Sequence, residues 1–317
     1  MARYLVTGGA GFIGSHVVHR LLRDGHGVRV LDDLSTGRVE NLEDVRSQIE
    51  WLQGDIRDRE LVAKACRGID YGIHEAAWRS VPKSMADPCG YTEVNVVGTV
   101  NVLEAAARAK VKRIVCVSSS SVYGEATQMP LREDQPTHPI SPYAASKLTC
   151  ELFCQLFSRS MGLETVAVRY FNVFGPRQSL ENEYAVVIPK FIVCLLNHES
   201  PPVYGDGAQS RDFTYVDNVV EGTLRAAQVP GISGEVFNIA LGEEHTVLEL
   251  LQELNAILGL SLPPTFKSHR PGDVQRTLAD PSKAQRLLGF TAGIRFTEGL
   301  RRTVEWFRAQ HRTLAAR

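Results

Sequence analysis

Short apolar runs alternate with amphipathic stretches over the first half of the chain. Apolar runs that read as strands lie at 4–6, 28–31, 69–74, 114–117 and 165–168. Stretches with apolar positions at helical spacing lie between them, the clearest near 91–110 and 142–160. Strands that alternate with helices predict an α/β fold built on a doubly wound parallel sheet.

A glycine run, Thr7-Gly8-Gly9-Ala10-Gly11-Phe12-Ile13-Gly14, joins the first strand to the first helix. Gly8 and Gly11 leave room for a pyrophosphate to approach the backbone, and Gly14 lets the helix pack closely on the strand. Phe12 and Ile13 open the helix, whose unpaired N–H groups favour an anion. The glycines are spaced three and three, a variant of the common dinucleotide fingerprint. Taken alone, the run is also compatible with a turn that binds nothing.

Acidic residues follow the next two strands. Asp32 ends the strand at 28–31, where a carboxylate accepts hydrogen bonds from an adenosine ribose, so it favours NAD over NADP. Asp55, with Ile56, closes a third short strand and could reach the adenine, although a turn or helix-capping Asp is an equal alternative. Arg38 is interpreted as a solvated loop residue, because Asp32 would repel a ribose phosphate beside it.

A tyrosine and a lysine four residues apart, Tyr143 and Lys147, share one face of the helix expected at 142–160. Leu148, Leu152 and Leu156 form an apolar stripe on that helix. An ammonium beside a phenol favours the phenolate, which suits the tyrosine to general-base chemistry. Such pairs also occur by chance on surface helices. A catalytic pair is favoured here because it follows a dinucleotide turn and a serine cluster.

Four serines, 118–121, come directly after the strand at 114–117. Ligands of open parallel sheets bind beyond the carboxyl ends of the strands, so the cluster is expected to supply hydroxyls to a site. A plain polar loop is the alternative.

The glycine run, Asp32, the serine cluster and the Tyr143/Lys147 pair, in this order, resemble the extended short-chain dehydrogenase/reductase family of NAD-dependent epimerases and dehydratases. The likeness runs nearly end to end and is strongest to the UDP-hexose 4-epimerase branch, including UDP-N-acetylglucosamine 4-epimerases. It implies NAD as the cofactor, Tyr143 as the base, Lys147 as the nicotinamide-ribose ligand, Ser119 as an aid to proton transfer and Tyr170 as a cofactor contact.

The resemblance also implies a site for a UDP-sugar. Its residues would be Ser80, Ser120, Asn172, Val187, Tyr204, Arg211, Arg270, Asp273 and Thr277. Arg211 and Arg270 would clamp the diphosphate, since a guanidinium binds phosphate bidentately. Thr277 stands where some relatives have Tyr, which leaves space for an N-acetyl group.

Two serines decide between reactions within this family. Ser120 and Ser121 replace the Asp and Glu of related 4,6-dehydratases, so elimination loses support, and the Glu of decarboxylating relatives is also missing. The expected activity is therefore UDP-hexose 4-epimerisation through a 4-keto sugar. A UDP-glucuronate 4-epimerase or decarboxylase, and a non-catalytic NAD-binding sensor, stay open as alternatives.

The second half of the chain has longer loops and shorter helices, which suit a smaller α/β substrate lobe. A helix at 216–227 and a strand at 235–240 are expected to return to the first lobe. The predicted NAD-binding domain is therefore 1–172 plus about 216–242, and the nucleotide-sugar lobe is 173–215 and 243–317.

The composition excludes several classes of binding partner. The 317 residues carry a net charge of −1 without a basic stripe, so neither nucleic acid nor a membrane is expected as a partner. No apolar run reaches the ~20 residues that span a bilayer. The six cysteines form no CxxC pair and the histidines lack metal-ligand spacing, so we expect a cytoplasmic protein without a metal site. By resemblance, a homodimer is expected through the helices near 95–110 and 142–160.

Overall fold

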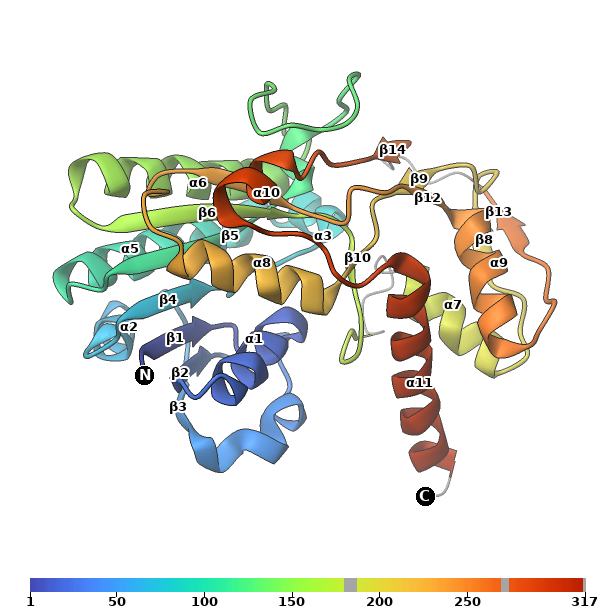
Figure 1. Cartoon of the computed structure of the whole chain (residues 1–317), viewed down its shortest axis with the longest axis horizontal. Helices are drawn as coiled ribbons and strands as arrows, with labels where there is room; N and C mark the ends of the chain where they lie inside the picture. The colour runs from blue at the N-terminus through green and yellow to red at the C-terminus, as the bar shows by residue number, and fades with distance from the viewer. Residues whose placement is uncertain (180–186, 269–273, 316–317) are drawn as a thin grey trace.

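Seven parallel strands form the central sheet of the chain, whose computed structural model describes residues 1–179, 187–268 and 274–315 (Figure 1). They are β1 (Arg3–Thr7), β2 (Gly27–Asp32), β3 (Ile49–Gln53), β4 (Tyr71–His74), β5 (Arg113–Ser119), β6 (Glu164–Tyr170) and β11 (Val236–Ile239). Their order across the sheet is β11-β6-β5-β4-β1-β2-β3, which reverses direction between β1 and β4. This confirms the predicted doubly wound Rossmann sheet.

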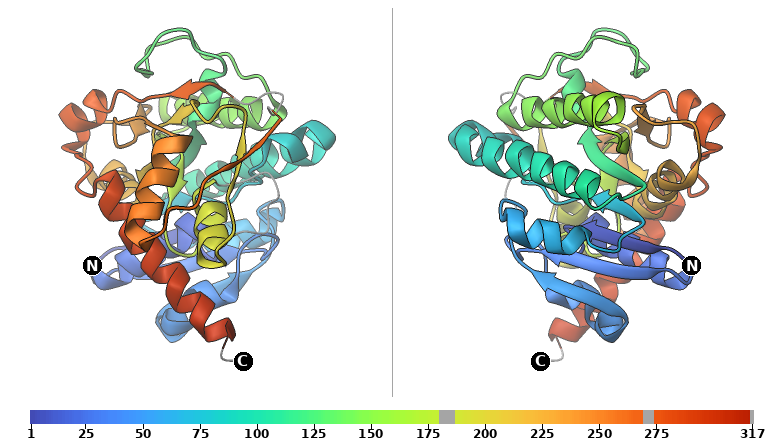
Figure 2. Two further views of the ribbon diagram at one scale, coloured as in Figure 1. Left: turned by 90° about the vertical axis from the view of Figure 1, so that its right-hand side faces the viewer. Right: turned by 90° about the vertical axis from the view of Figure 1, so that its left-hand side faces the viewer.

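Helices cover both faces of this sheet. The longer ones are α1 (Phe12–Arg23), α2 (Arg59–Cys66), α5 (Gly98–Arg108), α6 (Pro142–Ser160) and α8 (Val216–Gln228). The period of two along β1 assigns its side chains to the two faces: Tyr4 and Val6 join the apolar cluster under α1 and α8, while Leu5 joins the one under α2 and α5. Figure 2 shows the two helical layers from opposite sides.

Short helical segments complete the first lobe. They are η1 (Val39–Gln48), α3 (Val81–Ala86), α4 (Pro88–Tyr91), η2 (Thr92–Val97) and η3 (Ser120–Tyr123). The single helix predicted near 91–110 is thus a succession of α4, the π-helical η2 and α5.

The second lobe lies to the right in Figure 1. Its helices are α7 (Val187–Leu196), α9 (Val247–Leu258) and α11 (Phe296–Ala315), whereas α10 (Ser282–Leu288) packs against α8 and β11 of the first lobe. Its strands are β7 (Val173–Phe174), β8 (Pro202–Tyr204), β9 (Ser210–Arg211), β10 (Thr214–Tyr215), β12 (His245–Thr246), β13 (Thr265–Lys267) and β14 (Arg276–Thr277). The prediction of only short helices here is wrong for α11, which has 20 residues and packs against both α7 and α9.

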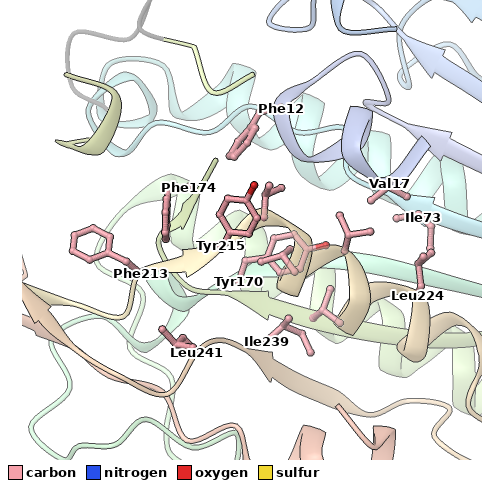
Figure 3. Close-up of a cluster of buried hydrophobic side chains, with 14 of the residues drawn as sticks. Phe12, Val17, Ile73, Tyr170, Phe174, Phe213, Tyr215, Leu224, Ile239 and Leu241 are labelled. Atoms are coloured by element: carbon pink, nitrogen blue, oxygen red, sulfur yellow. The ribbon is translucent and has the colours of Figure 1, made fainter. Parts of the chain in front are cut away.

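Aromatic side chains of the second lobe belong to the same apolar cluster as the side chains of the central sheet. Phe174 packs edge-on against Phe213, Tyr215 and Phe296, with ring centroids 5.7–6.5 Å apart. Figure 3 shows three of these rings beside Tyr170 and the apolar side chains of the sheet. The apolar core therefore continues from the first lobe into the second.

The helix α6 has the predicted bounds, because Ser141 accepts a hydrogen bond from the N–H of Ala144 and Pro142 occupies the first turn. Two leucines of its predicted stripe, however, face outward: Leu152 is 58% exposed and Leu156 49%, while Leu148 packs against a buried cluster. Across the described ranges, no helix is both long enough and apolar enough to cross a bilayer.

Candidate active site

A cleft follows the carboxyl ends of β1, β2 and β4. Most of the residues predicted to bind the cofactor line it, namely Gly8, Gly11, Phe12, Ile13, Gly14, Asp32 and Ile56. Glu75, Ala76, Ala77, Trp78, Arg79 and Val94 line it as well. It lies where the strand order reverses, the usual ligand position in an open α/β sheet.

The glycine turn has no room for side chains. Gly8 has φ +70°, and a Cβ there would lie 2.7 Å from the backbone nitrogen of Ala76. A Cβ on Gly14 would lie 2.1 Å from the carbonyl oxygen of Gly8. The first turn of α1 has neither a side-chain cap nor an acidic residue. Its N–H groups are left for an anion, so this turn fits a dinucleotide pyrophosphate.

Asp32 is buried at the end of β2, where it holds the glycine turn. Its two carboxylate oxygens accept hydrogen bonds from the N–H of Ala10 and of Leu34, both at 2.9 Å. Burial raises the pKa of this carboxyl. A bound 2′-phosphate would add a second negative charge beside it, so the site suits NAD better than NADP.

The structure does not favour the predicted contact of Asp55 with the adenine. Its carboxylate accepts a hydrogen bond from the N–H of Arg57 at 2.8 Å and pairs with the Arg57 guanidinium at 2.6 Å. The hydrogen bonds from Arg57 lower the pKa of Asp55. Of the two interpretations left open, this geometry favours the turn-forming Asp, and the neighbouring Ile56 faces the cleft instead.

Tyr143 and Lys147 lie one turn apart on α6. The Lys147 side chain is buried, and its Nζ donates to the carbonyl oxygen of Val117 on β5 at 2.8 Å. Tyr143 is half-buried, within electrostatic range of Arg79 on the cleft wall. The pair does not line the cleft itself, but Lys147 lies within electrostatic range of Glu75, and Tyr143 of Arg79, two residues that do.

The serine cluster caps β5. Ser119 Oγ accepts hydrogen bonds from the N–H and Oγ of Ser121 at 3.2 and 3.0 Å, and Ser120 begins η3. Ser118 points to the opposite side, where it donates to the buried Glu151. Ser119 and Ser120 are partly exposed, two and three residues beyond the carbonyl that binds Lys147.

Three of the predicted sugar-nucleotide residues meet although they lie far apart in the chain. Thr277 Oγ1 donates to Asn172 Oδ1 at 3.2 Å, and Thr277 pairs with Arg211 in the register of β14 and β9. The Arg211 guanidinium donates to the carbonyl oxygens of Ser210 at 2.8 Å and Gln275 at 3.3 Å. Arg270 and Asp273 lie outside the described residues.

The remaining predicted residues are spread along both lobes. Ser80 caps α3 by accepting from the N–H of Lys83. Val187 begins α7 and packs against the apolar core. Tyr204 ends β8, with the Lys190 ammonium 5.9 Å from its ring.

Tyr170 does not itself line the cleft. Its hydroxyl donates to Glu75 Oε1 at 2.8 Å, and Glu75 is a cleft residue that the sequence analysis missed. The signal was available, because Glu75 directly follows an apolar strand, as the serines do. In the parts of the chain that the structure describes, no three His, Cys, Asp or Glu side chains are grouped to hold a metal.

Comparison with known proteins identifies the class. The family model described as GDP-mannose 4,6 dehydratase matches residues 5–303, and the chain belongs to this family of extended short-chain dehydrogenases/reductases. The predicted resemblance is confirmed. The family is NAD-dependent, which confirms the predicted cofactor.

Particular relatives are similar over almost the whole chain. A UDP-glucose 4-epimerase from Mycolicibacterium smegmatis is 40% identical over 96% of this chain and 98% of its own length. A UDP-N-acetylglucosamine 4-epimerase from Methanobrevibacter ruminantium, solved with UDP-N-acetylmuramic acid, is 41% identical with a TM-score of 0.93, over 98% of this chain and 99% of its own. A UDP-glucose 4-epimerase from Thermus thermophilus, solved with NAD, is 37% identical with a TM-score of 0.88, over 96% and 99%.

Relatives named for another reaction also match. A UDP-N-acetyl-alpha-D-glucosaminuronate decarboxylase from Bacillus cytotoxicus is 34% identical over 96% of this chain and 98% of its own length. Overall similarity therefore does not separate the reactions.

Proposed function

We propose that this protein is a UDP-hexose 4-epimerase that interconverts UDP-glucose and UDP-galactose, with UDP-N-acetylglucosamine and UDP-N-acetylgalactosamine as a second candidate pair. The observation that supports the proposal is the position of Tyr143 and Lys147 within electrostatic range of Arg79 and Glu75, which line a cleft that fits a dinucleotide. Ser120 and Ser121, which stand in place of the carboxylates of dehydratases, favour epimerisation over elimination.

NAD, when bound, would supply the acceptor and later the donor of the hydride at C4 of the sugar. Tyr143 takes the proton of the sugar 4-hydroxyl, and Lys147 stabilises the phenolate by its positive charge. Ser119 holds the 4-oxygen by a hydrogen bond while the proton moves. After the 4-keto sugar has turned over within the site, Tyr143 returns the proton to the 4-oxygen, which gives the inverted alcohol.

The nucleotide would provide most of the binding energy. Arg211 and Arg270 would bind the diphosphate, Asp273 the uridine ribose and Tyr204 the uracil. Asn172 and Thr277, which are hydrogen-bonded to each other, would lie beside the sugar. A sugar held loosely by few groups can present either face, so modest discrimination among hexoses is expected.

The two lobes would divide the binding of the two ligands between them. Residues 1–172, together with about 216–242, would bind NAD, because β11 and α8 pack with the central sheet. Residues 173–215 and 243–317 would bind the nucleotide sugar. All six cysteines are unpaired, which supports the reducing cytoplasmic setting expected from the sequence.

A homodimer would cover the outward face of α6. Leu152 and Leu156 on α6 and Val97 at the end of η2 are each about half exposed, at 58%, 49% and 48%. Apolar side chains gathered on adjacent helices are typical of a subunit interface. A two-fold axis beside α5 and α6 would bury them against their copies.

The test is incubation of the purified protein with UDP-glucose, UDP-N-acetylglucosamine and UDP-glucuronate separately, with product analysis by NMR. Formation of a C4 epimer supports the proposal and identifies the sugar. A decarboxylated or 4-keto-6-deoxy product would refute it. Unchanged substrates in all three incubations, with NAD bound, would favour the sensor.

A matched variant tests the base. Tyr143→Phe keeps the ring and removes the hydroxyl, so turnover should fall about 10²–10⁴-fold, the contribution of a positioned base. NAD binding should persist. Loss of NAD from the variant would show that Tyr143 holds the cofactor and would leave its role as the base unsupported.

A further inference from the structure

Glu75 places a carboxyl group on the cofactor cleft between the glycine turn and Lys147. It directly follows β4, and its N–H donates to the carbonyl oxygen of Thr7 on β1 at 3.1 Å. In the sheet, β4 lies between β1, which carries the glycine turn, and β5, whose Val117 binds Lys147. A dinucleotide anchored by Asp32 and by the glycine turn must extend its second half over β4 and β5.

The side chain is held in place by hydrogen bonds. Tyr170 donates to Glu75 Oε1 at 2.8 Å, and Thr223 Oγ1 lies 2.7 Å from the same tyrosine hydroxyl. Thr223 in turn donates to the carbonyl oxygen of Val219 at 2.8 Å. Because hydroxyl groups both donate and accept, the Tyr170 hydroxyl can form a hydrogen bond with Glu75 in its ionised or its protonated form, while Thr223 is its other partner.

A carboxylate at this position is unfavourable for most of the cofactor. The pyrophosphate is anionic and would be repelled, and the adenosine half is bound elsewhere, at Asp32. The oxidised nicotinamide ring is the one cationic group of NAD, and reduction removes its charge. A fixed negative charge near the ring therefore stabilises the oxidised form more than the reduced form.

We propose that Glu75 is a positioning residue that sets the redox balance of the bound cofactor, by favouring NAD⁺ over NADH through its negative charge. The inference rests on the cofactor and does not depend on which sugar the protein uses. For an epimerase it has a direct use, since a site that favours the oxidised cofactor returns the hydride to the keto sugar and limits its escape.

The charge of Glu75 should depend on pH. Burial raises the pKa of Glu75 to about 7, opposed by the hydrogen bond from Tyr170 and by the positive charge of Lys147. The other titratable neighbour on the strand, His74, has its pKa lowered to about 3 by burial and stays neutral, bonded to Thr7 and Thr99. Raising the pH through 7 therefore turns the effect on.

The experiment measures the dissociation constants of NADH and NAD⁺ on cofactor-free protein, without sugar, for the wild type and for Glu75→Gln. Glutamine keeps the size and the acceptor for Tyr170 but removes the charge. The ratio Kd(NADH)/Kd(NAD⁺) should fall on the order of tenfold, the effect of one charge ~10 Å away at an effective dielectric constant near 20. The control Thr223→Val shortens the hydrogen-bond chain without changing the charge, and its ratio should stay within about twofold of wild type.

The pH dependence of the ratio and the separate affinities for the two ligands also test the role of Glu75. In the wild type, the ratio should fall towards that of Glu75→Gln as the pH is lowered from 8.5 to 5.5, whereas the variant's ratio should not change. An equal weakening of both ligands in Glu75→Gln would show that Glu75 only supports Tyr170, and would overturn the inference. A wild-type ratio that is independent of pH would do the same, whatever the epimerase assay shows.

Discussion

A buried ion pair lies directly behind the serine cluster. Glu151 on α6 and Arg169 on β6 are each 4% exposed and form two parallel hydrogen bonds, Nε to Oε1 at 2.9 Å and Nη2 to Oε2 at 2.7 Å. Ser118 donates to the same carboxylate, and the guanidinium of Arg169 lies 4.6 Å from the ring centre of Tyr123. The pair thus ties α6, which carries Tyr143, to β6, and Ser118 ties it to the end of β5.

Replacing Glu151 by Gln leaves the Arg169 charge buried with a neutral partner. Breaking a buried pair from one side costs about 3–5 kcal/mol, because the remaining charge keeps its desolvation penalty. An unfolding entropy of about 2.1 cal/mol/K per residue gives roughly 0.7 kcal/mol per degree for a chain of 317 residues. Calorimetry should therefore show a Tm lower by about 4–7 °C, and urea unfolding a matching loss.

The double variant Glu151→Leu with Arg169→Met separates charge from packing. Removing both charges together should cost about 1 kcal/mol or less, because hydrophobic replacement of a buried pair is often neutral. Together with the single variants Glu151→Leu and Arg169→Met, the double variant closes a cycle that should show a coupling of about 2 kcal/mol or more between the two positions. A loss below about 1 kcal/mol for Glu151→Gln alone would refute this reasoning, since it would mean that water or a shifted side chain already compensates Arg169.

Gly14→Ala should weaken NAD binding at least about tenfold and cost roughly 3 kcal/mol of stability, because its Cβ would lie 2.1 Å from a backbone oxygen. Calorimetric titration and thermal unfolding test this, with Gly293→Ala, which meets nothing within 4 Å, as the neutral control. Burial raises the pKa of Glu75 to about 7, so the folded state holds this proton more tightly than the unfolded chain, and its contribution to stability is lost as the pH rises from about 4.5 through 7. Urea unfolding of cofactor-free protein should show that Glu75→Gln loses up to about 3 kcal/mol less unfolding free energy than the wild type over this pH range. The same loss in both proteins would contradict a raised pKa for Glu75. Leu152→Glu should convert a dimer to a monomer in light scattering, whereas Leu287→Glu, at a position 44% exposed on α10, should not; an unchanged mass for Leu152→Glu would remove α6 from the interface.

Local signals in the sequence were enough for several elements. The bounds of α6 were predicted correctly because Ser141 and Pro142 are cap and first-turn residues, whose preferences come from the backbone of one turn. The leucines of the apolar stripe, by contrast, do not mark the buried face of α6. Cys150 and Cys154 point inward, while Leu152 faces out, and helical spacing alone cannot distinguish an inward stripe from an outward one.

The alternatives for Asp55 show the same limit. Both a cofactor contact and a turn-forming Asp were compatible with its position after a strand. The structure favours the turn, because Arg57 lies two residues away and takes both carboxylate oxygens. A side chain chooses among partners by distance, and those distances are fixed only when the chain has folded.

By itself, the sequence determined the Rossmann sheet, the glycine turn and the acidic residue after β2, since each depends on backbone geometry within a few residues. Only the tertiary structure brought Thr277 to Asn172, 105 residues earlier in the chain, and paired Thr277 with Arg211 across β14 and β9. It also turned Glu75 towards Tyr170 and Lys147. Contacts between distant segments depend on how whole elements pack, and packing is a property of the complete fold that no single stretch of sequence contains.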